Sequence, residues 1–351
     1  MENESECAYA ERRAGLLFGL FIGDALAMPV HWYYDRRALY RDYGWVSDYL
    51  VPKEVHPDSI LFRSQFKPVN ERAEILHREA KRYWGKRGSH YHSGLTAGEN
   101  TVNLLLGFEL LQDVVATGDY DADRYLRIYL DFMRTPGKHR DVYLEECHRE
   151  FFQNYARGKR LRKCGVDDNH IGGLASVGIL VAGQDADLET TRSNVQEHVG
   201  LTHQNSRVLR AADCLAVMLW RILRGESLER VLGEEATDYF SARKSARRSS
   251  RSDAEVIEQD FSPACYIEKA FPASLYLAWK YAEDFAPGLV SNTNLGGDNC
   301  HRGAVLGALL GAANGIRSIP SSWIDGLRLG PSLKREVDGL TAANREEIVA
   351  C

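Results

Sequence analysis

Apolar residues recur along most of the chain at positions three and four apart. This period matches the turn of an α-helix and not the two-residue repeat of a strand. No run of alternating polar and apolar residues that would indicate a sheet stands out. The pattern therefore predicts an all-α fold of many helices in a single domain. The clearest helical segments are TVNLLLGFELLQDVV (101–115), SRVLRAADCLAVMLWRILRG (206–225) and FPASLYLAWKYAEDF (271–285).

Glycine and proline indicate where these helices begin and end. Gly118, Gly225 and Gly288 each follow an apolar run, as glycine commonly does at a helix C-terminus, and Pro272 suits a helix start. Segment 35–93 is irregular and rich in Tyr, Arg, Pro and His, so we expect an insertion near a pocket mouth.

Composition limits the function classes. The 351 residues include 44 basic and 49 acidic side chains, a net charge of -5, which predicts no nucleic-acid or anionic-membrane partner. Seven cysteines without a Cys-x-x-Cys pair argue against a disulfide framework and a zinc ribbon, so a reducing cytoplasm is expected.

The apolar stretch 14–22 follows the acidic segment MENESE, whereas a signal peptide begins with a basic segment. No stretch reaches the length of about 20 apolar residues that is needed to span a bilayer. We interpret it as a core helix.

Two Gly-Asp motifs lie near opposite ends of the chain. Gly23-Asp24 is flanked by LLFGLFI and ALAM, and Gly297-Asp298 precedes NCHRGAVLGALLGAANG. Each places a carboxylate beside a small-residue apolar run that indicates a buried helix. Because burying an unpaired charge is costly, these carboxylates need partners. The pattern predicts a site assembled from both ends of the chain.

Four motifs together resemble the ADP-ribosylglycohydrolase family. They are Gly23-Asp24-Ala25, Gly98-Glu99-Asn100-Thr101, Thr202-His203 within GLTHQNSR, and Gly297-Asp298-Asn299-Cys300-His301. Their order and spacing match the family from about residue 12 to about residue 318, which leaves 319–351 as a C-terminal extension. The resemblance implies a single orthogonal multi-helix domain, a glycosidase-type activity on ADP-ribose bonds, and a metal site.

The metal motifs depart from the family pattern. The resemblance implies two magnesium ions held by carboxylate and hydroxyl oxygens. The corresponding positions here are Gly98, Glu99, Asn100, Asp298, Cys300 and His301. Two carboxylates, Glu99 and Asp298, remain where the family has four, so two adjacent dications would be poorly neutralised. One divalent ion held by Glu99, Asn100 and Asp298, a softer ion such as zinc using Cys300 or His301, and a metal-free pocket all stay open.

Catalytic candidates are Asp24, His31, Glu99 and Asp298. Asp24 can orient a ligand or the Glu99 segment, or cap a helix. His31 stands where many family members carry an acidic residue, so it is either a general base or a structural histidine. Glu99 and Asp298 supply negative charge. A thiolate–imidazole pair at Cys300 is a further alternative.

Substrate contacts are expected from two other segments. His90 and His92 in SHYHSGLTAGENT can reach a phosphate or a sugar hydroxyl, or belong to an ordinary surface loop. The glycines of HIGGLASVG, Gly172 and Gly173, permit close approach of a backbone to phosphates. Thr202-His203 corresponds to a family segment beside the pocket, although His203 can equally bond a buried backbone group.

The basic, serine-rich segment 242–253 is expected to be a solvated loop or a frayed helix, with a phosphate or partner contact as the alternative. Two functions follow for the whole chain. The first is a divergent hydrolase that cleaves an N- or O-ribosyl bond in an ADP-ribosylated protein or a small nucleotide-derived substrate. The second is a catalytically silent binding or structural protein on the same fold, as in the jellyfish lens crystallins. A monomer or a weak homo-oligomer is expected.

Overall fold

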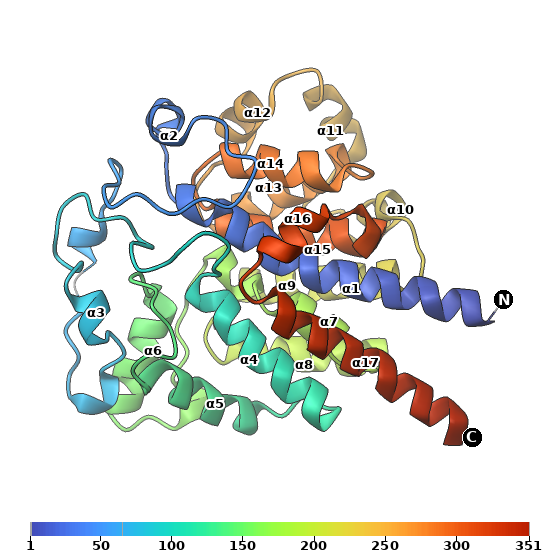
Figure 1. Cartoon of the computed structure of the whole chain (residues 1–351), viewed down its shortest axis with the longest axis horizontal. Helices are drawn as coiled ribbons and strands as arrows, with labels where there is room; N and C mark the ends of the chain where they lie inside the picture. The colour runs from blue at the N-terminus through green and yellow to red at the C-terminus, as the bar shows by residue number, and fades with distance from the viewer. Residues whose placement is uncertain (1, 65, 351) are drawn as a thin grey trace.

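Every regular element of this computed structural model is helical within residues 2–64 and 66–350, which are the residues it describes. Strand pairing in those residues is limited to isolated bridges. The predicted all-α class is therefore confirmed. Figure 1 shows the helices gathered around the first helix, α1.

The α-helices have the following bounds: α1 Glu2–Ala27, α2 Arg36–Tyr43, α3 Arg78–Lys81, α4 Val102–Thr117, α5 Ala122–Arg134, α6 Glu146–Ala156, α7 Val177–Ala182, α8 Leu188–Gly200, α9 Ser206–Leu223, α10 Leu228–Glu235, α11 Ala242–Arg248, α12 Asp253–Asp260, α13 Ile267–Lys280, α14 Phe285–Asn294, α15 Asn299–Asn314, α16 Ser321–Gly326 and α17 Gly330–Ala350. Short 3₁₀ helices are η1 Met28–Val30, η2 Leu61–Arg63, η3 Glu71–Ala73, η4 Leu161–Lys163, η5 Ile171–Leu174 and η6 Ile316–Ser318.

Helices α1 and α15 form an antiparallel pair in which glycines face glycines. A Cβ added at Gly19 would lie 2.1 Å from the carbonyl oxygen of Gly307, and one added at Gly23 would lie 2.0 Å from that of Gly303. A Cβ at Gly15 would meet the carbonyl oxygen of Gly311 at 2.2 Å. The four-residue spacing puts one glycine on the same helix face at each turn. The two backbones therefore touch along three consecutive turns.

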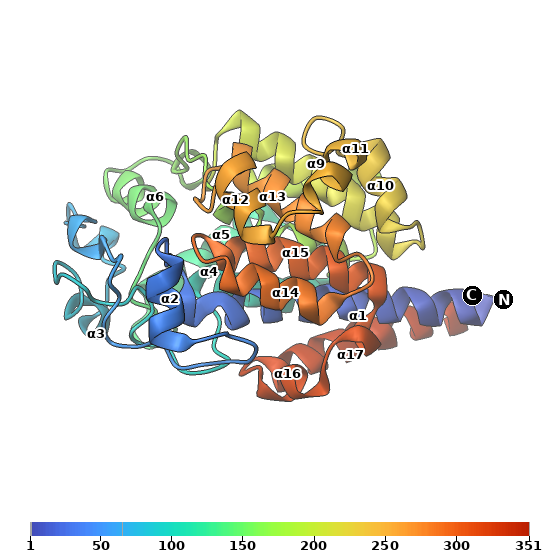
Figure 2. The ribbon, with the colours of Figure 1, turned by 90° about the horizontal axis from the view of Figure 1, so that it is seen from above.

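Other helices enclose this pair. In Figure 2, α16 and α17 lie on one side of α1, and α13 and α9 lie beyond α15 on the other. Helix α14 packs beside α15, and α7 contacts both α1 and α9. Leu16, Leu17, Leu20 and Phe21 of α1 are almost fully buried. The pair is consequently the centre of the hydrophobic core.

The segment Glu6–Val30 is long and apolar enough to cross a membrane, by length and composition. The sequence-based expectation that no stretch reaches this length is therefore wrong. Its most apolar window is 100% buried inside the molecule. That burial supports the interpretation of residues 14–22 as a core helix.

Three of the predicted helices are present with shifted ends. The segments 101–115, 206–225 and 271–285 correspond to α4, α9 and α13. Gly118 caps α4 with a φ of 78°. Pro272 does not start a helix but lies inside α13, which begins at Ile267. Gly288 lies inside α14 rather than at a helix end. The N–H of Ile267, which has no partner within the helix, donates to the carbonyl oxygen of Asn169 at 2.9 Å.

Segments outside the core have little regular structure or short helices. The range 35–93 holds α2, α3 and short 3₁₀ turns joined by irregular chain. Part of the basic segment 242–253 forms α11, and Ser252 makes a capping box with Glu255 at the start of α12. The C-terminal range 319–350 folds into α16 and α17.

Replacing Gly19 with alanine is expected to lower the free energy of unfolding by roughly 2 kcal/mol or more, because the methyl group overlaps the backbone of α15. Gly233→Ala in α10 is the matched control, since a Cβ there meets nothing within 4 Å. That variant should gain about 0.5–1 kcal/mol from helix propensity. Urea denaturation measures both, and equal effects would contradict the close-packing argument.

Candidate functional site

The two Gly-Asp motifs meet because α1 and α15 run in opposite directions. The end of α1 and η1 therefore lie beside the start of α15. Asp24 is near the last turn of α1, and Asp298 is the N-cap residue of α15. Both carboxylates are completely buried. The prediction that the chain ends converge agrees with this placement.

The loop before α15 can be built only with glycine. Gly296 and Gly297 have φ values of 64° and 62°, and a Cβ on either would collide with the carbonyl oxygen of Tyr33 or Pro263. Trp32 N donates to the carbonyl oxygen of Gly297 at 2.7 Å. Asp298 N donates to that of Pro263 at 2.8 Å. These bonds fix the Asp298 side chain in one position.

Asp298 lies between two histidines. Its Oδ1 is 3.1 Å from Nε2 of His31 and 2.9 Å from Nδ1 of His301. The rings of His31 and His301 meet edge to face at 5.6 Å. All three side chains are buried. Burial opposes ionisation of Asp298, but the two imidazoles outweigh it and hold the pKa of this carboxyl well below its usual range.

A second carboxylate continues the network. His31 Nδ1 is 2.7 Å from Nε2 of His92, and His92 Nδ1 is 2.7 Å from Oδ1 of Asp141. Asp141 also accepts from the backbone N–H groups of Val102 and Val142. The result is a buried row in the order Asp298, His31, His92, Asp141.

Counting protons shows that this row carries one imidazolium. Three hydrogen bonds join two ionised carboxylates through two rings, so the rings must supply three protons, and two neutral imidazoles supply only two. Burial lowers the pKa of His31 to about 3 despite its bond to Asp298.

His301 connects the cluster to a second set of polar groups. Its Nε2 is 2.8 Å from Nδ2 of Asn103, which also donates to Glu145 at 2.7 Å. Asn103 Oδ1 contacts His148 Nε2 at 2.7 Å, and the hydroxyl of Tyr129 contacts the other ring nitrogen. Asn103 is only partly buried, so it lies on the solvent side of the cluster.

The raised pKa of His301 and its contact with the Asn103 amide favour opposite protonation states of the ring. Burial lowers the pKa of His301, but Asp298 and Glu145 outweigh it and raise the value to about 10. The amide nitrogen of Asn103, in contrast, can bond Nε2 only when that nitrogen lacks a proton. We take the carboxylates to dominate, since two buried negative charges act on the ring, and the Asn103 amide keeps its bond to Glu145.

Asp24 holds the start of α4. It accepts from the Asn100 side-chain amide at 2.8 Å, and from the backbone N–H and hydroxyl of Thr101 at 2.9 and 2.8 Å. Burial raises its pKa against these bonds. Of the roles considered, this geometry corresponds to orienting the segment that follows Glu99.

Glu99 points away from Asp298 toward other partners. It accepts from the backbone N–H of Thr96 and from the guanidinium of Arg140, and its side chain is 22% exposed. Asn100 uses its amide on Asp24 and on the carbonyl oxygen of Phe21. The structure therefore does not bring Glu99 and Asn100 into bonding contact with Asp298.

The remaining predicted residues occupy buried positions around the cluster. Cys300 packs in an apolar group with Ala27, Met28 and Leu95, and burial raises its pKa well above the ordinary thiol value. His90 contacts the carbonyl oxygen of Pro29 at 3.0 Å and accepts from the backbone of His92.

Gly172 and Gly173 make room for side chains. A Cβ at Gly172 would lie 2.6 Å from the Glu145 carboxylate, and one at Gly173 would lie 2.9 Å from the His203 ring. His203 Nδ1 is 2.9 Å from the Thr202 hydroxyl. Its Nε2 has no partner among the described residues. These glycines thus allow Glu145 and His203 to approach the site.

Sequence reasoning missed four polar residues of the network, which are Asn103, Asp141, Glu145 and His148. A usable signal was present, since DVYLEECHREFF places acidic and imidazole side chains inside an otherwise apolar run. Glu145 is the N-cap residue of α6, and His148 lies in the first turn of that helix.

The donor set does not fit two magnesium ions. Hard oxygen ligands are needed, and Glu99 and Asn100 are already bonded elsewhere. A single softer ion fits better, because one ligand atom each from His31, Asp298 and His301 lies within 4.8 Å of the others. His31, His92 and Cys300 form a second such group. Nitrogen, oxygen and sulfur donors are those that zinc accepts.

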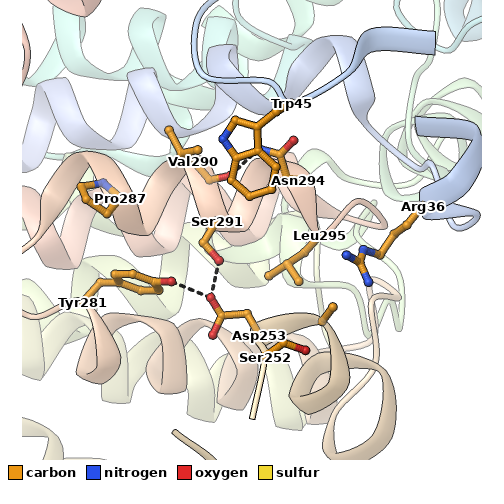
Figure 3. A pocket seen from close by; sticks show the side chains of 11 residues that line it. Arg36, Trp45, Ser252, Asp253, Tyr281, Pro287, Val290, Ser291, Asn294 and Leu295 are labelled. Atoms are coloured by element: carbon orange, nitrogen blue, oxygen red, sulfur yellow. Dashed lines mark hydrogen bonds between the residues drawn. The ribbon is translucent and has the colours of Figure 1, made fainter. Parts of the chain in front are cut away.

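A cavity of about 440 Å³ lies outside this cluster (Figure 3). Its lining includes Arg36, Trp45 and Asp253, and it contains none of the predicted site residues. Asp253 accepts from Tyr281 and Ser291 and pairs with Lys280 at 2.6 Å. Its carboxylate is therefore satisfied within the protein.

The fold and the site define an all-α protein whose buried histidine–carboxylate cluster is assembled from both ends of the chain. The ADP-ribosylglycohydrolase family profile matches residues 5–348, so the chain belongs to that family. Crystallin J1A of Tripedalia cystophora is 22% identical over 352 residues, covering 94% of this chain and 96% of the crystallin. A solved ADP-ribosylglycohydrolase-related protein complex has a TM-score of 0.60 at 23% identity, covering 95% and 98% of the two chains. This structural similarity supports the fold.

Histidine NMR can test the charge assignment. We expect His301 to stay protonated up to about pH 10, and Asp298→Asn to lower its pKa toward or below the ordinary 6.5, because burial then acts with one carboxylate fewer. His198, whose pKa burial lowers to about 3, should not change in this variant.

The raised pKa of His301 also predicts how the free energy of unfolding depends on pH. The folded-state pKa of His301 is raised, so its stabilisation is complete below about pH 6.5 and is lost as the pH rises toward 10. Asp298→Asn should flatten this loss in urea denaturation. A His301 resonance that titrates near pH 6.5 in the unsubstituted protein would contradict the assignment.

Proposed function

We propose that this protein is a divergent ADP-ribosylglycohydrolase-like hydrolase that cleaves an N- or O-ribosyl bond in an ADP-ribosylated or nucleotide-derived substrate. The observation that carries the proposal is the buried Asp298 held between His31 and His301. Family membership supports the reaction class.

The chemistry follows from the charge at this position. Cleavage at the anomeric carbon of a ribose passes through an oxocarbenium-like state, which a nearby ionised carboxylate stabilises. Asp298 stays ionised because two imidazoles hold its pKa low. The negative charge is therefore in place before substrate arrives, at no further cost in reorganisation.

The two histidines that contact Asp298 have different parts. His31 is neutral, and its Nε2 contacts Asp298 while its Nδ1 contacts His92, so it holds the carboxylate in position. His301, protonated, is suited to donate toward a leaving-group oxygen or nitrogen.

A divalent ion can be accommodated by His31, Asp298 and His301 once His301 has released its proton. When bound there it would supply Lewis acidity and a more acidic water. The protein's own part is to hold these three donors and to keep bulk water out by burial.

A second function is a catalytically silent binding or structural role. The polar groups of the cluster satisfy one another and are buried, which is what a stabilising core network requires. A relative of nearly equal length is named as a crystallin. Under this alternative the cluster serves stability alone.

ADP-ribose binding and hydrolysis distinguish the two functions. Metal-stripped protein would be titrated with ADP-ribose, alone and with magnesium, manganese or zinc, and then assayed on ADP-ribosylated peptides and small ribosyl compounds. We expect Asp298→Asn to lower turnover by roughly 10²-fold or more, since it removes the charge at the anomeric carbon. Asp253→Asn, a carboxylate of the separate cavity, is the control and should retain activity.

The outcomes of these assays separate the hydrolase from the structural function. Binding without metal favours a histidine-assisted enzyme or a binding protein, and stimulation by zinc over magnesium favours the softer-ion site. Absence of binding and turnover under every condition, in folded protein, would refute the hydrolase and leave the structural function.

A further inference from the structure

Three segments that are distant in the sequence are bonded together at helix α6. Val166 N donates to the carbonyl oxygen of Thr202 at 3.0 Å, and Gln204 N donates to that of Val166 at 2.7 Å. These two bonds make a parallel bridge between the segments. The side-chain amide of Asn154 in α6 donates to the carbonyl oxygen of Cys164 at 2.9 Å. The backbone around residue 166 is therefore fixed both to α6 and to the turn before α9.

A thiol, a carboxylate and an imidazole converge where these segments meet. One ligand atom each from Cys147, Asp168 and His203 lies within 4.8 Å of the other two. Cys147 is in the first turn of α6, Asp168 comes two residues after Val166, and His203 takes part in the bridge. The three residues are 0%, 7% and 4% exposed, respectively. The cluster is therefore shielded from bulk water.

The imidazole of His203 has one ring nitrogen left for a ligand. Its Nδ1 is 2.9 Å from the Thr202 hydroxyl, while Nε2 is buried and has no partner among the described residues. A buried nitrogen without a partner is costly, and most such atoms in proteins are bonded. When Nδ1 carries the proton and donates it to Thr202, the lone pair of Nε2 is free to bind a cation.

The carboxylate of Asp168 is oriented by a neighbouring histidine. Its Oδ1 accepts from the backbone N–H of His170 at 2.9 Å and lies 2.7 Å from Nδ1 of the same residue. Both bonds fall on one oxygen, so the other oxygen can act as a ligand. An outer hydrogen bond that holds a carboxylate in this way is typical of metal sites.

A second group that shares Cys147 is less suitable for an ion. Glu145, Cys147 and His148 also bring ligand atoms within 4.8 Å of one another. Both ring nitrogens of His148 are already bonded, one to Tyr129 and the other to Asn103. Asn103 also donates to Glu145 at 2.7 Å. An ion in this group would break these bonds, so the group with the unbonded imidazole is the better site.

We propose that Cys147, Asp168 and His203 bind one divalent ion of the zinc type. The thiolate and the carboxylate together carry two negative charges, which a dication neutralises, while the imidazole binds in its neutral form. The ion and its ligands are then neutral as a group, which suits a buried position. Sulfur and nitrogen ligands favour zinc over magnesium. Three protein ligands leave the fourth position of a tetrahedral ion for water.

This ion is separate from the one that His31, Asp298 and His301 can accommodate, because the two groups share no ligand. Bound there, it would link α6 to the segment around Asp168 and to the turn before α9. The inference goes beyond the proposed hydrolysis and does not require it.

Cobalt(II) is the probe for this site, because its bond to a thiolate gives a charge-transfer absorption in the near ultraviolet. Metal-stripped full-length protein would be titrated with cobalt(II) and then with zinc, and the bound metal would be measured by elemental analysis. We expect the thiolate absorption to saturate with a single bound ion and zinc to abolish it by displacement. Magnesium in excess should leave it unchanged. The group of His31, Asp298 and His301 contains no sulfur and gives no such absorption.

Variants assign the absorption to one cysteine. Cys147→Ser should abolish it, whereas Cys300→Ser should keep it and is the matched control, because both thiols are completely buried and each belongs to a possible metal group. Asp298→Asn should also keep it, which separates this site from the proposed hydrolase. His170→Gln should weaken cobalt(II) binding roughly 10–100-fold, the usual effect of losing an outer hydrogen bond to a ligand.

Far-ultraviolet circular dichroism reports whether each variant is folded. Where Cys147→Ser does not fold, loss of cobalt(II) binding in His203→Gln carries the test instead. The proposal would be overturned by a thiolate absorption that persists in folded Cys147→Ser or disappears in folded Cys300→Ser. Absence of this absorption in the unsubstituted protein would overturn it as well.

Discussion

Close backbone contact between α1 and α15 is the constraint on which the rest of this structure depends. Glycines at three consecutive turns of each helix remove the side chains that would separate them. The helices can then approach closely only along one face and in one register. Because the pair is antiparallel, that register places residues 24–33 beside residues 296–301. The site is thus a consequence of helix packing before any of its side chains is considered.

Burial of so many ionisable groups requires that their charges cancel locally. Asp298 is completely buried, and its negative charge is tolerated because His31 and His301 both face it. Asp141 is bonded in the same row to His92. An unpaired carboxylate in this core would cost several kcal/mol. The contacts that stabilise the buried Asp298 carboxylate also hold its pKa low and keep it ionised, so stability and chemistry have one physical origin.

The sequence was enough to predict the helices and the meeting of the chain ends, because both follow from local patterns. Helical periodicity located α4 and α9, and the two Gly-Asp motifs marked the carboxylates that need partners. The partners themselves depend on which helix faces meet, and that is a tertiary property. Glu99, expected near Asp298, is bonded to Arg140 instead, while Asp141 enters the network through a loop that no periodicity describes. Pro272 was wrong as a helix start, since it lies inside α13, which begins five residues earlier at Ile267.

The residues that depart from the family's metal motifs include histidines that bond the remaining carboxylate, Asp298. Where the family pattern supplies carboxylates and hydroxyls for hard ions, this chain supplies imidazoles that donate hydrogen bonds to the carboxylate that remains. His301, whose pKa is raised to about 10, provides positive charge beside Asp298, and the neutral His31 donates a hydrogen bond to the same carboxylate. Asp298 therefore stays ionised although the ligands for two magnesium ions are absent. The histidines therefore compensate the charge of Asp298 from within the chain and keep a polar centre in the fold.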